Sequence, residues 1–534
     1  MNIKRAKEEI KDTIEAYLYR DEFGEYAIPA IRQRPVLLIG PPGVGKTQIM
    51  EQIAKECRIG LVAYTITHHT RQSAIGLPFI EKKSYGGKEY SVTEYTMSEI
   101  VASIYDKIEA TGLKEGILFI DEINCVSETL APTMLQFLQC KTFGSHKIPE
   151  GWVIVAAGNP PEYNKSVRDF DVVTLDRIKK IMVEPDFEVW KEYAYQVNIH
   201  PAVLAYLSVK KQYFCHIETT VDGRMFATPR GWEDLSRLIQ VYEKLDKQVD
   251  REVIVQYLQH PKIAKDFANY LELYDKYQNE YQVDEILAGV IRESLCDKLA
   301  KAAFDERLSV VGLLLSKLGS QFGQVLWQEE MMGRLMSVLK RFQQSETDGT
   351  GAGQAAGSSR NGASKRTFNG AGRMSELLQE TEQEWESLKK QEVLTRKEDI
   401  LYQNMMKKLE EYRSALILWE KGAGQAASSG EGRPDDAGAP KGLDAAWDFL
   451  REKFAADSDA FENSFDQASQ MLEHGFDFME AAFGDSQEMV IFITELNTSF
   501  NCTRFLQEYD CERYYQYNKR LLFDDAEQEI LAGM

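Results

Sequence analysis

Eight consecutive residues combine glycines with a lysine and a threonine, a composition suited to holding a chain of phosphates. They are Gly40, Pro41, Pro42, Gly43, Val44, Gly45, Lys46 and Thr47. They follow an apolar run and precede a stretch with helical spacing, which is the context of a P-loop. Backbone N–H groups of the turn would wrap the phosphates, Lys46 would reach the β- and γ-phosphates, and Thr47 would hold Mg²⁺. The sequence therefore predicts a site for ATP and Mg²⁺.

Two carboxylates end a second apolar run further along the chain. Residues 116–120 are apolar and are followed directly by Asp121 and Glu122. We predict that Asp121 lies on the magnesium shell, as a second ligand beside Thr47, and that Glu122 polarises the attacking water. The pair strengthens the P-loop interpretation because both motifs serve one reaction.

Two further polar residues are predicted to reach the same site. The apolar run 153–157 leads to Asn159, which could orient the lytic water next to the carboxylates. Thr228 and Pro229 have the residue types of a helix N-cap and first turn, so Arg230 begins a helix and can face phosphate. The alternatives are a turn asparagine and a solvated surface arginine.

The elements that position these residues alternate between strand and helix, which is typical of a parallel α/β sheet. Strands are expected at 35–39, 61–66, 117–120, 153–157 and 179–183, and helices at 46–56, 97–110 and 128–139. Residues 187–342 show helical spacing only. Strands that end in polar residues would deliver those residues to one edge of the sheet.

Taken together, these motifs resemble AAA+ ATPases, in which Walker A, Walker B, sensor 1 and sensor 2 occur in this order. The resemblance covers roughly residues 1–241. Within AAA+ the chain is most similar to the MoxR family. Residues 79–94 resemble the hairpin insert of that family, turning at 85–88, and 142–150 weakly match its second hairpin. Leu175, Asp176 and Arg177 resemble its LDR segment.

The resemblance implies an active site completed by an arginine from the neighbouring subunit. Arg177 is the first candidate for this finger and Arg168 the second, with a purely structural arginine as the alternative. It also implies a ring, usually a hexamer, and chaperone-like remodelling of a protein partner. MoxR ATPases often act with von Willebrand A domain proteins. This sequence has no DxSxS motif of its own, so that partner would be a separate chain.

Composition divides the rest of the chain into helical stretches and Gly/Ala/Ser-rich linkers. We interpret the helices beyond Phe342 as a partner-binding or regulatory arm; the alternative is that they pack onto the lid. The predicted segments are 1–185 (α/β nucleotide-binding subdomain), 186–342 (helical lid with extra helices), 343–373 (flexible linker), 374–421 (charged helix or helical hairpin), 422–442 (flexible linker) and 443–534 (acidic helical domain).

Charge and cysteine usage exclude several classes. A net charge of −21 and a pI of about 5.0 argue against nucleic acid as the main ligand. The seven scattered cysteines and the lack of a membrane-length apolar run indicate a cytoplasmic protein. No NKxD motif for guanine is present, so a GTPase is disfavoured. A DNA-associated AAA+ motor and a non-motor ATP-binding scaffold remain as alternatives, and a metalloenzyme built on His68 and His69 is weaker.

Overall fold

The computed structural model separates the chain into two compact units. It describes residues 1–68, 72, 74, 76–143, 146–163, 170, 172–220, 223–344, 369–428 and 443–521. The first unit comprises Met1–Tyr274 with Leu388–Leu394, and the second comprises Asp275–Ser387 with Thr395–Met534. Among the described residues, no helix combines the length and hydropathy needed to cross a membrane.

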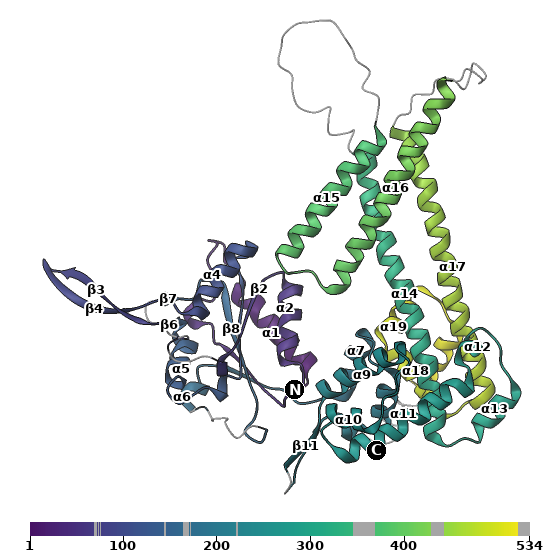
Figure 1. The fold of residues 1–534 in the computed structure, drawn as a ribbon, viewed down its shortest axis with the longest axis horizontal. Helices are drawn as coiled ribbons and strands as arrows, with labels where there is room; N and C mark the ends of the chain where they lie inside the picture. Colours follow the sequence, from purple (N-terminus) through teal and green to yellow (C-terminus); the bar gives the residue numbers. More distant parts are fainter. Residues whose placement is uncertain are drawn as a thin grey trace, which may run out of the picture. The chain divides into compact units, whose positions relative to one another are not determined.

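A five-stranded sheet forms the centre of the first unit (Figure 1). Its order is β2-β5-β8-β1-β9 and all of its pairings are parallel. The strands are β1 (Val36–Ile39), β2 (Gly60–Thr65), β5 (Gly116–Asp121), β8 (Trp152–Gly158) and β9 (Lys179–Met182). All residues of β1 and β8 are buried, as expected for parallel strands covered on both faces. The predicted parallel α/β sheet, with its five strands, is confirmed.

Helices cover the two faces of this sheet. On one face, Val36 and Leu38 pack in a cluster with residues of α1 (Ile3–Leu18) and α2 (Lys46–Cys57). On the other, Leu37 and Ile39 pack with α4 (Glu99–Thr111) and α5 (Ala131–Cys140). The alternation of β1 side chains between two cores fixes the strand that leads into the glycine-rich turn. The remaining short elements are α6 (Val172–Leu175) and the 3-10 helices at Ala30–Arg32, Ile66–His68, Ile123–Cys125 and Lys211–Tyr213.

A long hairpin extends from the first unit between β2 and α4. Strands β3 (Pro78–Tyr85) and β4 (Lys88–Tyr95) pair antiparallel and are joined by Gly86 and Gly87. Both glycines have positive φ, 60° and 79°, which a two-residue hairpin turn of the I′ type requires. The predicted hairpin and its turn are therefore confirmed.

Two further hairpins lie in the first unit, and one of them corrects the sequence interpretation. The pair β6 (Thr142–Phe143) and β7 (His146–Lys147) agrees with the weak match before β8. The pair β10 (His216–Thr220) and β11 (Gly223–Ala227) contradicts the expectation of helices only in residues 187–342. The isoleucine and threonines of β10 favour a strand. The segment is too short for its pattern of apolar residues to distinguish a strand from a helix.

Helices complete the first unit beyond the sheet. Trp232, Tyr206 and Phe267 are buried at their centre, with the Tyr206 and Trp232 rings 5.7 Å apart. This part is the predicted helical lid in type, with the β10–β11 hairpin inserted. Its helices are α7 (Phe187–Gln196), α8 (Pro201–Val209), α9 (Pro229–Lys244), α10 (Arg251–Tyr257) and α11 (Pro261–Tyr281), the last of which crosses into the second unit.

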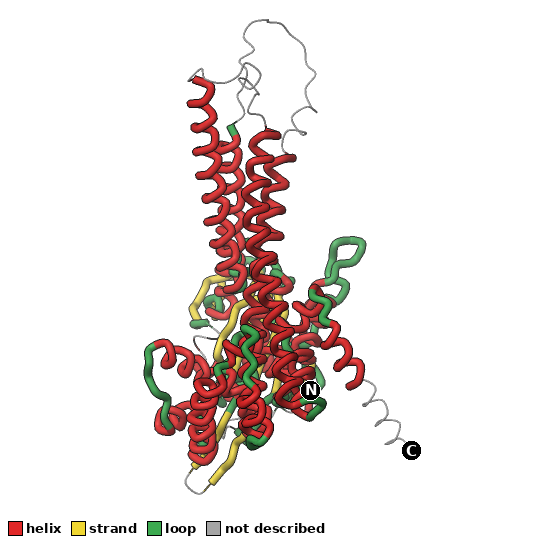
Figure 2. Tube along the Cα trace, turned by 90° about the vertical axis from the view of Figure 1, so that its right-hand side faces the viewer, coloured by secondary structure: helices red, strands yellow, loops and turns green. Residues whose placement is uncertain are grey.

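The second unit is entirely helical in its described residues, and its long helices lie side by side (Figures 1 and 2). The 41-residue helices α14 and α17 form its main contact, and α19 and α18 also pack on α14. The helices are α12 (Val283–Leu287), α13 (Glu293–Ala300), α14 (Phe304–Gln344), α15 (Gly370–Lys390), α16 (Arg396–Ser428), α17 (Leu443–Phe483), α18 (Gln487–Thr498) and α19 (Phe500–Glu508).

The segment boundaries predicted from composition differ from these contacts. The boundary at residue 342 falls inside the second unit, because α14 packs on helices that lie beyond residue 443. The charged segment is a helical hairpin, in which Trp385 Nε1 donates to Asp399 Oδ1 at 2.7 Å. Parts of the two predicted linkers are helical: residues 343–344 belong to α14, 370–373 to α15 and 422–428 to α16, and residue 369 directly precedes α15. The remainder of each linker, 345–368 and 429–442, lies outside the described residues.

We expect a chain that ends at Gln344 to lose the fold of residues 275–344 and to aggregate. Phe322 stacks on Phe505 of α19 with ring centroids 4.0 Å apart, and Leu318 and Leu335 of α14 are also fully buried. Exposing one such side chain to water removes roughly 1.5–3 kcal/mol of stabilisation. A whole domain has a free energy of unfolding of only about 5–15 kcal/mol. Size-exclusion chromatography and circular dichroism would measure the loss.

Point variants in the full chain test the effect of losing a packing contact without shortening the chain. Phe322→Ala should destabilise the second unit by about 3–5 kcal/mol in a denaturant titration. Leu418→Ala is the matched control, because Leu418 is 71% exposed on α16 and should change little. A soluble, cooperatively folded chain ending at Gln344 would show instead that the helices after residue 369 form an independent arm.

Candidate functional site

The glycine-rich turn lies between β1 and α2 and is shaped for close approach of a ligand. Gly43 and Gly45 have φ of 79° and 91°, a conformation that favours glycine, and Gly45 is the N-cap of α2. A Cβ on Gly43 would lie only 3.2 Å from Arg230 Cβ and 3.3 Å from Thr228 Cβ. The turn therefore presents bare backbone at a helix N-terminus, which is a ready anion site.

Lys46 is buried and its ammonium is fixed at the mouth of the turn. Its Nζ donates to Gly40 O and Pro41 O, both at 2.8 Å, and to Asn159 Oδ1 at 3.0 Å. Burial lowers the pKa of Lys46 to about 8, while the nearby carboxylate of Asp121 opposes this shift. All three N–H donors of the ammonium have acceptors, none of them a carboxylate, so a bound phosphate would replace at least one of these oxygens.

Thr47 and Asp121 form the predicted magnesium pair. Thr47 Oγ1 donates to Asp121 Oδ2 at 3.0 Å, which joins the first turn of α2 to the end of β5. Both side chains would bind the metal through oxygen, the type of ligand that Mg²⁺ prefers. Two protein ligands are enough because Mg²⁺ usually keeps several bound waters. The residues present therefore fit Mg²⁺ bound together with a phosphate chain.

Glu122 leaves β5 in an unusual backbone conformation that turns it into the site. Its φ is 57°, and its amide N donates to the Asp121 Oδ1 carboxylate oxygen at 2.9 Å. Thr67 Oγ1, just after β2, donates to Glu122 Oε2 at 2.7 Å. The sequence interpretation missed Thr67. Thr65 is the parallel partner of Asp121, and this strand register, which short sequence motifs do not encode, brings Thr67 to the same edge of the sheet.

Asn159 stands at the end of β8 as predicted, and a second asparagine supports it. Asn124 Nδ2 donates to the backbone Asn159 O at 2.7 Å, while Asn124 Oδ1 has no partner among the described residues. A Cβ on Gly158 would come within 2.4 Å of Asn124 Oδ1, so glycine is required there. Asn124 was not predicted, because only the strand register brings it beneath β8.

Helix α9 brings Arg230 to the opposite wall. Thr228 Oγ1 accepts from Gly231 N at 3.2 Å, which confirms the predicted N-cap. Tyr193 of α7 ties this wall to α2, because Gln48 Nε2 donates to its hydroxyl at 2.6 Å and that hydroxyl donates to Glu233 Oε1 at 3.2 Å. Burial and the Glu233 carboxylate raise the pKa of Tyr193 to about 12, so this link persists at neutral pH.

These side chains surround one cleft of about 480 Å³ in the first unit. Lys46, Thr47, Asp121, Glu122 and Asn159 line one side, and Arg230 lines the other. The cleft holds phosphate-binding cations, a carboxylate pair at a strand end and a helix N-terminus. Such a set is suited to phosphoryl chemistry on a nucleotide.

Comparison with sequence families agrees with this geometry. Residues 36–175 match the family described as ATPase family associated with various cellular activities (AAA). This segment is an AAA domain. It runs from the first residue of β1 to the last of α6, and covers about a quarter of the chain. No curated protein matches the chain.

Two solved structures are similar to part of the chain. A predicted ATPase from Cytophaga hutchinsonii is 18% identical, with a TM-score of 0.23, over 37% of this chain and 56% of its own. A lysine-to-arginine mutant of Thermotoga maritima RuvB is 17% identical, with a TM-score of 0.26, over 48% of this chain and 69% of its own. At these TM-scores neither likeness bears on function.

The first candidate for the arginine finger, Arg177, lies away from the cleft of the AAA domain. Arg177, between α6 and β9, is exposed and donates to Gln139 Oε1 of α5. It does not line the cleft, so within its own subunit it cannot touch a nucleotide bound there. Arg168 lies outside the described residues.

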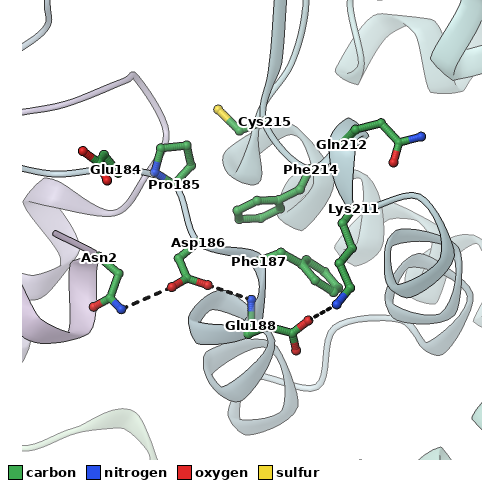
Figure 3. A pocket seen from close by; sticks show the side chains of 10 residues that line it. All are labelled: Asn2, Glu184, Pro185, Asp186, Phe187, Glu188, Lys211, Gln212, Phe214 and Cys215. Atoms are coloured by element: carbon green, nitrogen blue, oxygen red, sulfur yellow. Dashed lines mark hydrogen bonds and ion pairs between the residues drawn. The ribbon is translucent and has the colours of Figure 1, made fainter. Parts of the chain in front are cut away.

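A larger cavity of about 700 Å³ lies beside the AAA domain, at the start of α7 (Figure 3). Phe187 and Phe214 form an edge-to-face pair on its wall, with ring centroids 5.6 Å apart. Four of its polar side chains are already paired: Asp186 accepts from Asn2 Nδ2 at 3.2 Å and caps α7, and Glu188 pairs with Lys211. The catalytic groups therefore belong to the smaller cleft.

Proposed function

We propose that this protein is a MoxR-like AAA+ ATPase that hydrolyses ATP in an oligomeric ring to remodel or activate a protein partner. The observation that carries the proposal is the meeting of Lys46, Thr47, Asp121, Glu122 and Asn159 in one cleft. These groups come from the ends of two strands, β5 and β8, and from the first turn of α2, and they supply phosphate binding, magnesium binding and activation of water.

The geometry suggests a division of roles. Lys46 and the N-terminus of α2 bind phosphate, and Thr47 and Asp121 hold Mg²⁺, which supplies charge neutralisation when bound. Glu122 takes the proton of the attacking water, and Asn159, held at 3.0 Å from Lys46 Nζ, orients that water. Arg230 reaches phosphate from α9, so binding a nucleotide would draw α9 toward the glycine-rich turn.

Steady-state hydrolysis with and without Mg²⁺ tests the activity, and sedimentation with and without ATP tests the ring. The proposal requires Mg²⁺-dependent phosphate release and a larger assembly with ATP. Tight ATP binding without release would favour the non-motor scaffold. Strong stimulation by DNA would favour the DNA-associated motor, although the net charge of −21 argues against it.

The MoxR assignment and the partner rest on resemblance, supported by the two hairpins that precede α4 and β8. We propose a cytoplasmic ring, most simply a hexamer, whose partner is a separate protein with a von Willebrand A domain. Affinity capture from the source cells with ATP and with ADP would test this. Absence of such a protein from the ATP-dependent captures would remove this choice of partner.

Thr67→Val should slow turnover about tenfold, the equivalent of about 1.4 kcal/mol. Valine keeps the shape of threonine but removes the hydroxyl that donates to Glu122 Oε2 at 2.7 Å. Thr67 acts as a positioning residue, so we expect kcat to fall while KM for ATP stays constant. Thr67→Ser should restore the rate, and equal losses in the serine and valine variants would contradict the role.

A further inference from the structure

Two histidines and a glutamate gather beside the β10–β11 hairpin in the helical part of the first unit. The ligand atoms of His216, Glu218 and His260 all lie within 4.8 Å of one another. The rings of His216 and His260 are 5.2 Å apart, and His260 Nε2 lies 3.3 Å from Glu218 Oε2. None of these residues lines the nucleotide cleft.

The backbone holds the three side chains toward one point. His216 and Glu218 are two apart in β10, so both project from the same face of the hairpin. Their partners across the hairpin are Ala227 and Met225, which place no cation on that face. Phe226 N donates to Gln259 O at 3.0 Å, and this bond fixes His260 beside the strands.

Another histidine in the same unit, His200, has surroundings similar to those of His260. Helix capping and packing alone therefore account for a buried histidine beside a glutamate. His200, like His260, precedes a proline at a helix start, and its Nδ1 accepts a backbone N–H. His200 Nε2 pairs with Glu243 Oε1 at 2.8 Å. A buried histidine that caps a helix and pairs with a glutamate is thus a repeated structural device in this chain. The additional histidine, His216, is what distinguishes the cluster at His260.

We propose that His216, Glu218 and His260 bind a divalent transition metal of the zinc class. Two imidazoles and one carboxylate are a common ligand set for Zn²⁺, with a water in the fourth position. The site differs from the Mg²⁺ pair in its nitrogen ligands, which a soft-to-borderline metal prefers. The proposal does not depend on ATP hydrolysis.

Closing the site needs small movements that the surroundings allow. Tetrahedral Zn²⁺ with bonds of about 2.0–2.1 Å brings its ligand atoms to about 3.3 Å from one another. The Glu218 side chain is 44% exposed and can rotate, whereas that of His260 is 4% exposed and fixed. His260 Nδ1 accepts from Ile263 N at a long 3.4 Å. Coordination through Nε2 moves the ring proton to Nδ1 and gives up this bond.

The position of the site suggests a structural consequence. Strand β11 ends at Ala227, directly before Thr228 and Arg230 at the start of α9. A metal held between β10 and the start of α11 would fasten the hairpin that leads into this wall of the cleft. We therefore expect the metal to raise stability first, and to affect nucleotide binding only through α9.

Zn²⁺ binding to the chelator-treated full chain tests the proposal. Competition against a fluorescent chelator should give one tight site per chain, and Co²⁺ should give the visible absorption of a tetrahedral site. His216→Ala should weaken Zn²⁺ binding at least 100-fold, because removing a residue that merely orients a metal ligand already costs about 10- to 100-fold in affinity. His216 lies at the partly exposed start of β10, so this variant spares the buried cap formed by His260.

Two controls make the result decisive. His200→Ala removes the matched histidine and should leave Zn²⁺ affinity unchanged. Asp121→Asn should also leave it unchanged; loss of binding in this variant would place the ion in the nucleotide cleft and overturn the proposal. A wild-type chain that binds no Zn²⁺, or a His216→Ala chain that binds it equally well, would do the same. Zn²⁺ should raise the melting temperature of wild type but not of His216→Ala.

Discussion

Glu122→Gln is expected to leave ATP bound and to lower its turnover by roughly 10²- to 10⁴-fold. Glutamine has nearly the same shape and can still accept the hydrogen bond from Thr67 Oγ1, which spans 2.7 Å in the wild type. It cannot take a proton from water, so only the chemical step is lost. Phosphate release and binding of a fluorescent ATP analogue, measured on the same preparation, separate the two effects.

Two comparison variants give this result its meaning. Lys46→Ala should lose ATP binding itself, because the ammonium that lies 3.0 Å from Asn159 Oδ1 is the cation of the glycine-rich turn. Glu128→Gln changes an exposed carboxylate in the loop that follows β5, and should alter neither binding nor turnover. Unchanged turnover in Glu122→Gln would remove this residue as the general base.

The sheet and most of the cleft could be predicted because local sequence decides them. The predicted strands 117–120 and 153–157 are apolar runs closely followed by polar residues, and parallel pairing brings their ends to one edge beside the glycine-rich turn. Lys46, Asp121 and Asn159 therefore met as expected. Thr67 and Asn124 were missed because their roles depend on the register between neighbouring strands, which short motifs do not encode.

Contacts between segments that are far apart in the sequence could not be predicted either. The Gly/Ala/Ser-rich segments suggested a boundary near residue 342, yet Phe322 of α14 finds its partner in Phe505. Linker composition describes local chain character and says nothing about which helices pack together across it. In the same way, His216 and His260 belong to separate elements, and tertiary contacts such as the bond from Phe226 N to Gln259 O bring those elements together.

Arg177→Ala is expected to reduce turnover by roughly 10³- to 10⁵-fold, if it supplies the finger of a shared site. Within its own subunit Arg177 is exposed and lies outside the cleft. Val172 and Val173 of the neighbouring α6 are 81% and 61% exposed, an apolar surface that supports contact with a second copy. An arginine at such a contact can neutralise charge on phosphate bound by the next subunit.

The single variant needs a control for a purely structural role. Arg177 donates a hydrogen bond to Gln139 Oε1. If that bond is its only function, Gln139→Ala should reduce turnover as much as Arg177→Ala does. If Arg177 is a finger, Gln139→Ala should retain most activity. Arg451→Ala, an exposed arginine of α17, reports the effect of removing a surface charge alone.

Mixing two inactive variants decides between shared and separate sites. Glu122→Gln subunits keep Arg177, and Arg177→Ala subunits keep Glu122, so each variant should be inactive by itself. In rings mixed at equal amounts, about a quarter of the interfaces would pair an intact Glu122 with an intact Arg177 from the neighbour. Turnover should therefore reappear on mixing. If the mixture stays inactive although the subunits exchange, the site is not shared through Arg177, and the same experiment with Arg168→Ala tests the second candidate.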